Sequence, residues 1–211
     1  MDSPPAVLSV NLADMRTVMR DGEPVPTGIW KLPAEGRVAV GRDGLAGDVQ
    51  ADRKVHGGPD MAVYAYARED IDWWEGELGR PLENGTFGEN LTLAGVDASG
   101  PLVGERWRVG TALLEVSAPR VPCWKLGAKM GDPRFIKRFA KALRTGTYLR
   151  VIEEGELGAG DAVEIVSRPD HDVTVRLAAR AFLADASLAP RVLEAPQLPC
   201  AWREWAQGRA A

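Results

Sequence analysis

The sequence contains few of the residues that build disulfide or zinc sites. Among its 211 residues there are two cysteines, Cys123 and Cys200, and two histidines, with no C-x-x-C pair. Two cysteines do not make a disulfide framework, and a structural zinc site is not expected from this set. An apolar run near the roughly 18 residues of a membrane span is also missing. Residues 1–5 lack the basic and apolar regions of a signal peptide. We therefore expect a cytoplasmic protein with no membrane partner.

An excess of positive charge is absent as well. Lys and Arg number 26 against 30 Asp and Glu, which gives a formal net charge of −4. Surfaces that bind nucleic acid are normally basic, so this balance argues against a nucleic-acid polymer as partner. Glycine and proline, by contrast, are abundant, with 23 and 15 residues. Their number favours a mainly β body that is rich in turns.

Short alternating segments predict the strands of that body. They lie at residues 7–12, 38–40, 62–66, 145–152 and 161–166, with a hairpin between 104 and 117. Residues 68–78 change to a helical period, with Ile71, Trp74 and Leu78 on one face. A second helix is expected with Asp132 as its N-cap and Pro133 at its first position.

Beyond residue 168 the pattern changes to short helices, at 175–183, 188–193 and 199–206. We therefore divide the chain into a body, residues 1–168, and a three-helix C-terminal module, residues 169–211. A module of this size buries little apolar core by itself. It should therefore pack on the body or on a partner subunit. Cys200, within it, is expected to be a small buried side chain. A homodimer is compatible with this pattern.

Cys123 lies in a loop braced by proline. Pro119 and Pro122 each fix a backbone dihedral angle and remove a donor, so the loop cannot continue a sheet. Arg120 and Lys125 bring positive charge near the thiol, and nearby cations favour the thiolate. A thiolate in such a loop is either a soft metal ligand or a nucleophile, and the residues alone leave both open.

Three other motifs carry candidate site residues. Lys31 follows a short apolar segment, and the residues alone favour a solvated strand end. His56 precedes Gly57 and Gly58, where it either orders a turn or donates a proton near neutral pH. Asn90 follows a glycine-containing turn, and its amide could either form the turn or face a polar ligand.

Taken together and in order, these motifs resemble the MOSC family, named after the C-terminal domain of molybdenum-cofactor sulfurase. The resemblance is strongest to the stand-alone bacterial branch linked to resistance against N-hydroxylated base analogues. It rests on Gly28-Ile29-Trp30-Lys31, on Gly47-Asp48 with Val55-His56-Gly57-Gly58, on Phe87-Gly88-Glu89-Asn90-Leu91, and on Pro119-Arg120-Val121-Pro122-Cys123-Trp124-Lys125-Leu126. The C-terminal helices resemble the small module that follows the barrel in that branch.

The resemblance implies a closed, irregular β-barrel with flanking helices. It also implies that Cys123 binds the molybdenum of a pterin cofactor (a molybdopterin type), as suits a soft anionic thiolate. The cofactor's phosphate would need cations and loop amides. The candidates for this binding, and for the pterin edge, are Lys31, Arg120 with Arg150 behind it, Asn90, Gly57 and Gly58. His56 would donate a proton to a leaving oxygen.

Relatives of this kind reduce N-hydroxylated compounds, such as 6-hydroxylaminopurine, to amines. No flavin, haem or iron–sulfur motif is visible, so the electrons are expected from a separate reductase. One alternative is a cofactor carrier or sulfur-transfer module that bears a persulfide on Cys123. Another is a thiol enzyme in which His56 activates Cys123 as its base. Pyridoxal phosphate is not expected, because the sulfurase relatives bind it through a separate N-terminal domain.

Overall fold

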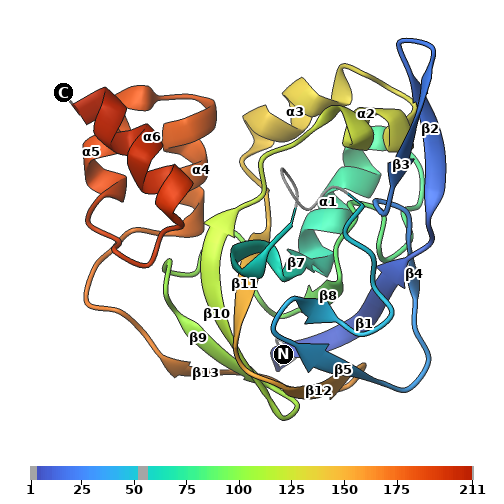
Figure 1. Ribbon diagram of the computed structural model, residues 1–211, viewed down its shortest axis with the longest axis horizontal. Coiled ribbons are helices and arrows are strands. Elements are labelled where there is room, and N and C mark those ends of the chain that lie inside the picture. The colour runs from blue at the N-terminus through green and yellow to red at the C-terminus, as the bar shows by residue number, and fades with distance from the viewer. Residues whose placement is uncertain (1–3, 52–56, 211) are drawn as a thin grey trace.

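The computed structural model describes residues 4–51 and 57–210, and its body is dominated by β-sheet (Figure 1). An eight-stranded sheet has the order β13-β9-β10-β11-β7-β8-β1-β4, a three-stranded sheet the order β12-β5-β6, and β2 pairs with β3 alone. The strands are β1 (Ala6–Ala13), β2 (Arg16–Arg20), β3 (Glu23–Thr27), β4 (Lys31–Pro33), β5 (Arg37–Gly41), β6 (Gly44–Leu45), β7 (Val63–Ala67), β8 (Leu91–Ala94), β9 (Arg106–Val109), β10 (Ala112–Pro119), β11 (Thr147–Glu153), β12 (Gly155–Gly158) and β13 (Val163–Ser167).

The expected closed barrel is not confirmed, although the sheet-dominated body is. The strand order ends at β13 on one side and at β4 on the other. A single bridge, between Ala6 and Ala162, links the start of β1 to the residue before β13. Around it the Val7 amide donates to the Asp161 carbonyl at 2.9 Å. The sheet therefore curves until its ends approach, without a continuous ladder between the described strands.

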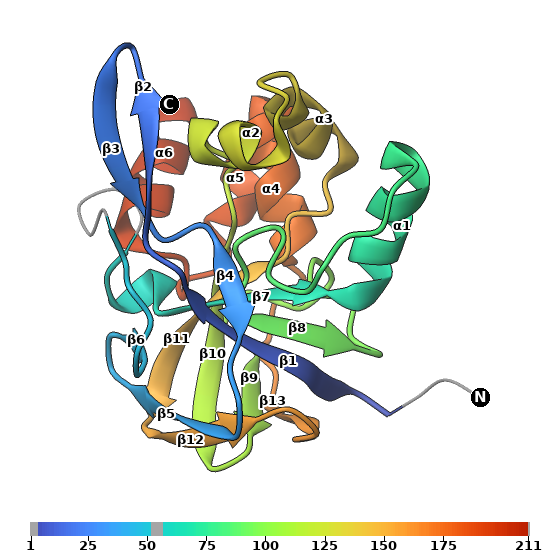
Figure 2. The same cartoon turned by 90° about the vertical axis from the view of Figure 1, so that its right-hand side faces the viewer.

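Helices pack against this sheet in two groups (Figures 1 and 2). The helices of the body are α1 (Arg68–Leu78), α2 (Trp124–Met130) and α3 (Phe135–Ala142), with a 3-10 turn at Pro59–Met61. They enclose an aromatic cluster on β7, in which Tyr66, Trp74, Phe87 and Phe139 are almost fully buried. Leu126 of α2 belongs to this cluster, and α2 begins directly after Cys123.

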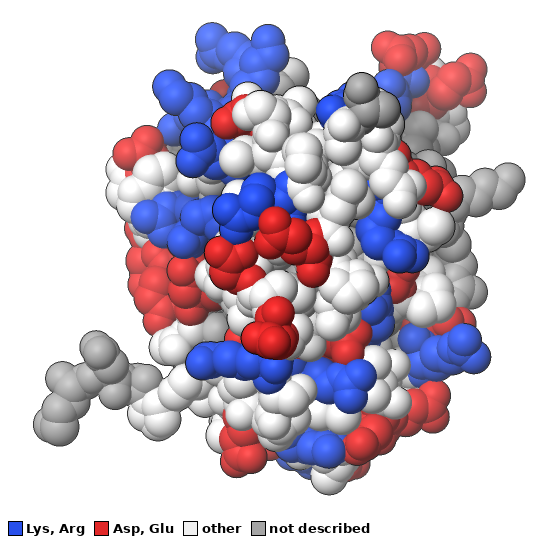
Figure 3. Space-filling view, turned by 90° about the vertical axis from the view of Figure 1, so that its left-hand side faces the viewer, with Lys and Arg blue, Asp and Glu red and all other residues white. Residues whose placement is uncertain are grey.

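The second group is the C-terminal helices α4 (Val175–Leu183), α5 (Ala189–Val192) and α6 (Cys200–Ala210), with a 3-10 turn at Ala186–Leu188. Thr174 caps α4, because its Oγ1 accepts from the Leu177 amide at 3.0 Å. The buried face of α4 belongs to the same apolar core as the sheet. In the outer face of these helices charges of both signs are interspersed (Figure 3). None of the described helices is long and apolar enough to cross a membrane.

Three local expectations were wrong or incomplete. The helix expected at Asp132 begins at Phe135, with Arg134 as its N-cap residue. Asp132 Oδ1 accepts from the Arg134 amide at 2.9 Å, in the turn before the helix. Cys200 is exposed rather than buried, and its thiol donates to Glu204 Oε1 at 3.3 Å. The β2–β3 hairpin was not predicted, because β3 carries two prolines. A ribbon of two strands tolerates them, since its outer edges need no amide donors.

Candidate functional site

A cavity of about 100 Å³ opens where four segments of the body meet, and Lys31, Asn90, Arg120 and Cys123 all line it. Lys31 begins β4, Asn90 precedes β8, Arg120 follows β10, and Cys123 is the N-cap residue of α2. These four predicted residues are thus brought together from positions up to 92 residues apart in the sequence.

Two glycines allow these segments to approach one another. A Cβ on Gly28 would lie 2.3 Å from the Val49 carbonyl oxygen, so only glycine fits there without a backbone shift. Gly88 has φ of 81°, in the left-handed region, and a Cβ would lie 2.8 Å from Ile29 Cγ1. Both glycines line the cavity. The motifs that contain them therefore shape its wall through backbone contacts.

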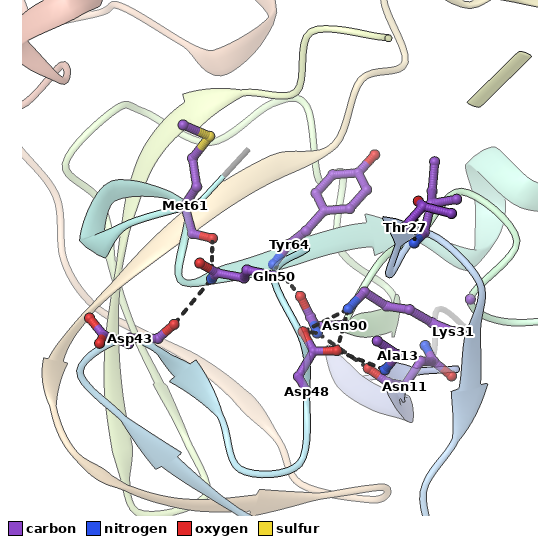
Figure 4. A network of polar contacts seen from close by, with 12 residues as sticks. Asn11, Ala13, Thr27, Lys31, Asp43, Asp48, Gln50, Met61, Tyr64 and Asn90 are labelled. Atoms are coloured by element: carbon purple, nitrogen blue, oxygen red, sulfur yellow. Dashed lines mark hydrogen bonds and ion pairs between the residues drawn. The ribbon is translucent and has the colours of Figure 1, made fainter. Parts of the chain in front are cut away.

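Asp48 is the acceptor around which one side of the cavity is organised (Figure 4). Its carboxylate accepts from Lys31 Nζ at 2.5 and 2.7 Å, from Asn90 Nδ2 at 2.8 Å, and from the Ala13 amide at 2.7 Å. Burial lowers the pKa of Lys31, and the ion pair with Asp48 opposes that shift. The charge of Lys31 is therefore compensated inside the protein.

The amide of Asn90 is also committed within the protein. Its Oδ1 accepts from the Tyr64 amide at 3.1 Å, and its Nδ2 donates to Asp48 and to the Asn11 carbonyl oxygen at 3.3 Å. These bonds use both amide hydrogens. The prediction that Asn90 contacts a pterin edge stays untested, and in this structure the side chain ties β7 and β1 to Asp48.

Arg120 is the cation that remains without a compensating carboxylate. It is 5% exposed, and its Nη1 is a buried donor with no hydrogen-bond partner. The guanidinium carbon lies 5.4 Å from the centre of the Tyr64 ring and 5.7 Å from that of Phe139. Within the described ranges no carboxylate pairs with it. A buried donor of this kind is costly unless a partner satisfies it, so Arg120 is a candidate position for an anion.

The electrostatic surroundings of Arg120 keep it charged. Burial lowers its pKa, but the neighbouring side chains of Tyr64, Tyr148 and Cys123 more than offset that effect. Burial likewise raises the pKa of Tyr148, while the charge of Arg120 opposes the rise. The cavity therefore contains a permanent cation beside neutral phenols and the Cys123 thiol.

Two further lysines lie at the site. Lys125 was expected only to bring positive charge near the thiol, and Lys129 was not singled out from the sequence. Lys125, the second residue of α2, lines the cavity, is 7% exposed, and has no hydrogen bond or ion pair within residues 4–51 and 57–210. Lys129 donates to the carbonyl oxygens of Ile29 and Gly85 at 3.0 and 2.6 Å. Burial lowers the pKa of Lys129 to about 8. The spacing of four residues on a helix was the available signal, since it places both lysines on one face.

Glu89 supports the loop that carries Asn90. Its fully buried carboxylate accepts from the amides of Gly85 and Phe87, at 2.6 and 2.9 Å, and from Thr92 Oγ1 at 3.0 Å. Burial raises its pKa, and these bonds oppose the shift. Glu89 thus acts inside the loop and does not face the cavity.

The remaining predicted residues lie elsewhere. Arg150 does not line the cavity, because its guanidinium bonds Asp60, Glu115 and the Gln197 carbonyl oxygen, each within 3.0 Å. Gly57 and Gly58 line a neighbouring cleft that Cys123 also borders. His56 falls outside the described residues.

The charges of the lining fit the anionic cofactor that the resemblance implies. Among the described lining residues Lys31, Arg120 and Lys125 stand against Asp48 as the one carboxylate. Arginine and lysine are the usual protein ligands of phosphate, and Arg120 Nη1 has an unused donor. Cys123, which forms no disulfide, supplies a soft donor atom at the same wall.

Comparisons with known proteins agree on one family. The family model described as "MOSC domain" matches residues 52–164. The Bacillus subtilis protein YflK is 40% identical over 201 residues, covering 94% of this chain and 91% of its own length. The crystal structure of YiiM from Geobacillus stearothermophilus superposes with a TM-score of 0.82 at 31% identity, covering 99% of this chain and all of that one. A Gibberella moniliformis protein named "Reductase" is 31% identical over 172 residues, which are 79% of this chain and 30% of that protein.

Proposed function

The chain belongs to the MOSC domain family, and on that premise we propose that it binds a molybdenum cofactor and reduces N-hydroxylated compounds. Cys123 is the proposed metal ligand, and the electrons come from a separate reductase. The observation that carries the proposal is the buried guanidinium of Arg120, with an unpaired Nη1, in the same cavity as the Cys123 thiol.

The overall reaction converts R–NHOH into R–NH2 and water. The N–O bond breaks, and two electrons and two protons are consumed. The bound cofactor supplies the two-electron redox chemistry, and the electron donor replenishes it. A relative that bears the name "Reductase" supports this class of reaction, and the aligned region is less than a third of that protein.

The chain's own residues have three tasks in this proposal. Arg120 and Lys125 hold the phosphate of the cofactor, since both are buried cations without a carboxylate partner among the described residues. Lys31 acts indirectly, because its ion pair with Asp48 fixes the part of the cavity wall that these two residues form. Burial keeps Tyr148 protonated, so its phenol can offer a hydrogen bond to a polar group near Cys123.

The first experiment measures molybdenum and pterin in protein purified from a host supplied with molybdate. We expect about one molybdenum per chain in the wild type and none in Cys123→Ala, with unchanged circular dichroism. Cys200→Ala is the matched control and should keep its metal, because Cys200 does not line the cationic cavity. Normal metal content in Cys123→Ala would remove Cys123 as the ligand.

The second experiment follows the reduction of 6-hydroxylaminopurine by the cofactor-loaded protein with a chemical electron donor. Loaded protein that leaves this compound and other N-hydroxylated compounds unchanged would refute the reductase. His56→Ala, outside the described residues, should slow turnover and leave the metal content intact. A persulfide trapped on Cys123 after incubation with a cysteine desulfurase, in protein without turnover, would favour the sulfur-carrier alternative.

A further inference from the structure

Cys123 borders a second cavity in addition to the cationic one. This cleft has a volume of about 430 Å³ and lies between the proline-braced loop and the C-terminal helices. The two cavities share four lining residues, which are Met61, Val121, Cys123 and Tyr148. The thiol therefore lies where the two spaces meet, and a group held at Cys123 can be reached from either side.

The two cavities differ in chemistry. Three cations line the first, whereas among the described residues no lysine or arginine lines the second. Its one charged lining residue is Asp60, whose carboxylate is paired with Arg150 at 2.7 Å. Most of the lining is apolar, and includes Pro119, Pro122 and Pro199. A phosphate would lose its hydration in this cleft without gaining a cation.

Aromatic side chains from the C-terminal helices form one wall of the cleft. Phe182 of α4 and Trp202 of α6 have ring centroids 4.9 Å apart at an angle of 47°. Phe182 is 40% exposed, which is high for a large aromatic side chain. Flat heterocycles stack on exposed aromatic faces, and the volume of the cleft lies in the range of small-molecule sites.

We propose that this cleft is the substrate site of the proposed reductase, and that it selects uncharged, flat N-hydroxylated bases over their phosphorylated nucleotides. The inference rests on the proposed function. The base packs on Phe182 and Trp202 with its N–OH group directed toward Cys123, while the cofactor's phosphate occupies the cationic side. The C-terminal helices thereby supply the specificity of a reaction whose redox centre is bound by the body.

The connection between the C-terminal helices and the body supports this arrangement. Arg150 of β11 bonds Asp60, which lines the cleft, and also the carbonyl oxygen of Gln197, just before α6. The position of α6 relative to Cys123 is therefore fixed by a partly buried guanidinium. Such a tie suits a wall that must stand at a defined distance from a reacting group.

The test measures binding and turnover in the intact chain, residues 1–211. Calorimetric titration with 6-hydroxylaminopurine and with its ribonucleoside 5′-monophosphate, without an electron donor, should show the free base binding at least about tenfold more tightly. Phe182→Ala should weaken base binding about tenfold, as expected for loss of a stacking contact. In cofactor-loaded Phe182→Ala the KM should rise by a similar factor while kcat and molybdenum content stay near the wild-type values.

A second variant fills the cleft without removing a contact. Ala201 is an exposed cleft residue on α6, so Ala201→Trp should fold normally and abolish base binding. Trp73→Ala is the matched control for Phe182→Ala. Trp73 is likewise an exposed aromatic residue, 37% exposed, but it lies on α1, outside the cleft lining. This control should bind the base as the wild type does.

The outcomes separate this inference from the proposed function. Turnover with a KM unaffected by Phe182→Ala and Ala201→Trp would overturn the cleft assignment and leave the reductase standing. A preference for the nucleotide would overturn the proposed selectivity. If the loaded wild type reduces no N-hydroxylated compound, the proposed function fails and this inference fails with it.

Discussion

Lys31 Nζ lies 2.5 Å from Asp48 Oδ1, and the two side chains are 8% and 7% exposed. A lysine for which the residues alone favoured a solvated strand end is thus half of a buried ion pair. The pair also holds Asn90, and it joins β4 to the segment that precedes residue 52. In this structure the ion pair fixes the wall of the cavity that Lys31, Asp48 and Asn90 line.

The ion pair can be tested by a double-mutant cycle. Asp48→Asn leaves the lysine buried without a counter-charge, and we expect it to cost about 3–5 kcal/mol in the free energy of unfolding. Lys31→Met should cost less, because Asp48 keeps the Ala13 and Asn90 donors. The double variant should be less damaged than the sum of the two. Chemical denaturation measures all three, and additive losses would contradict the pairing. The exposed pair of Arg191 and Asp172 is the control, and Asp172→Asn should change little.

Arg120 should contribute to binding at the expense of stability. Its buried charge lacks a carboxylate partner among the described residues, so Arg120→Met should unfold at the same or a higher denaturant concentration. Added phosphate should raise the melting temperature of the wild type, relative to chloride at equal ionic strength, and should not raise that of Arg120→Met. Arg134→Met, which removes a highly exposed arginine, should keep the phosphate response. A destabilised Arg120→Met that still responds to phosphate would show a structural role instead.

Arg150 should act on the C-terminal helices and not on the cofactor. Arg150→Met removes the bond to the Gln197 carbonyl oxygen and those to Asp60 and Glu115, at a cost of about 2 kcal/mol. Amide hydrogen exchange in α6 should become faster, while molybdenum content should not change. Arg168→Met is a useful control, because its bond to Glu105 lies outside the cavity and the cleft. Lost molybdenum with unchanged exchange would return Arg150 to the cofactor site.

Lys129 gives a pH dependence of defined sign. Burial lowers its pKa from 10.5 to about 8. Between these two values the unfolded chain holds a proton that the folded chain has lost, so stability should rise with pH across that window. Relative to Lys129→Met, in which the other groups titrate alike, the gain should be on the order of 3 kcal/mol. Urea denaturation at pH 7, 8.5 and 10 measures it, and a difference that stays flat or falls would mean that Lys129 is not desolvated in solution.

Local pattern was enough to predict much of the fold. The helical period placed α1 at Arg68–Leu78 and α4 at Val175–Leu183, and alternation found β1, β5, β7 and the β9–β10 hairpin. It missed α2, because the seven residues Trp124–Met130 follow two prolines and are too few to show a period. Long-range pairing, which decides whether a sheet closes, leaves no local trace. The closed barrel therefore came from the resemblance alone, and it is the part of the fold that was not confirmed.

The sequence by itself determined the family and the chemistry available to the site. Its motifs contain a thiol, cations and glycine turns, and these are properties of residue types and of their order. Tertiary structure decided what each group does with its charge. Asp48 compensates Lys31 and engages Asn90, whereas Arg120 and Lys125 are buried without such a partner among the described residues. The tertiary structure also placed Phe182 and Trp202 across a cleft from Cys123. The physical reason is that burial and pairing depend on residues brought together from distant parts of the chain. Desolvation and pairing then set the free energy of each charged group.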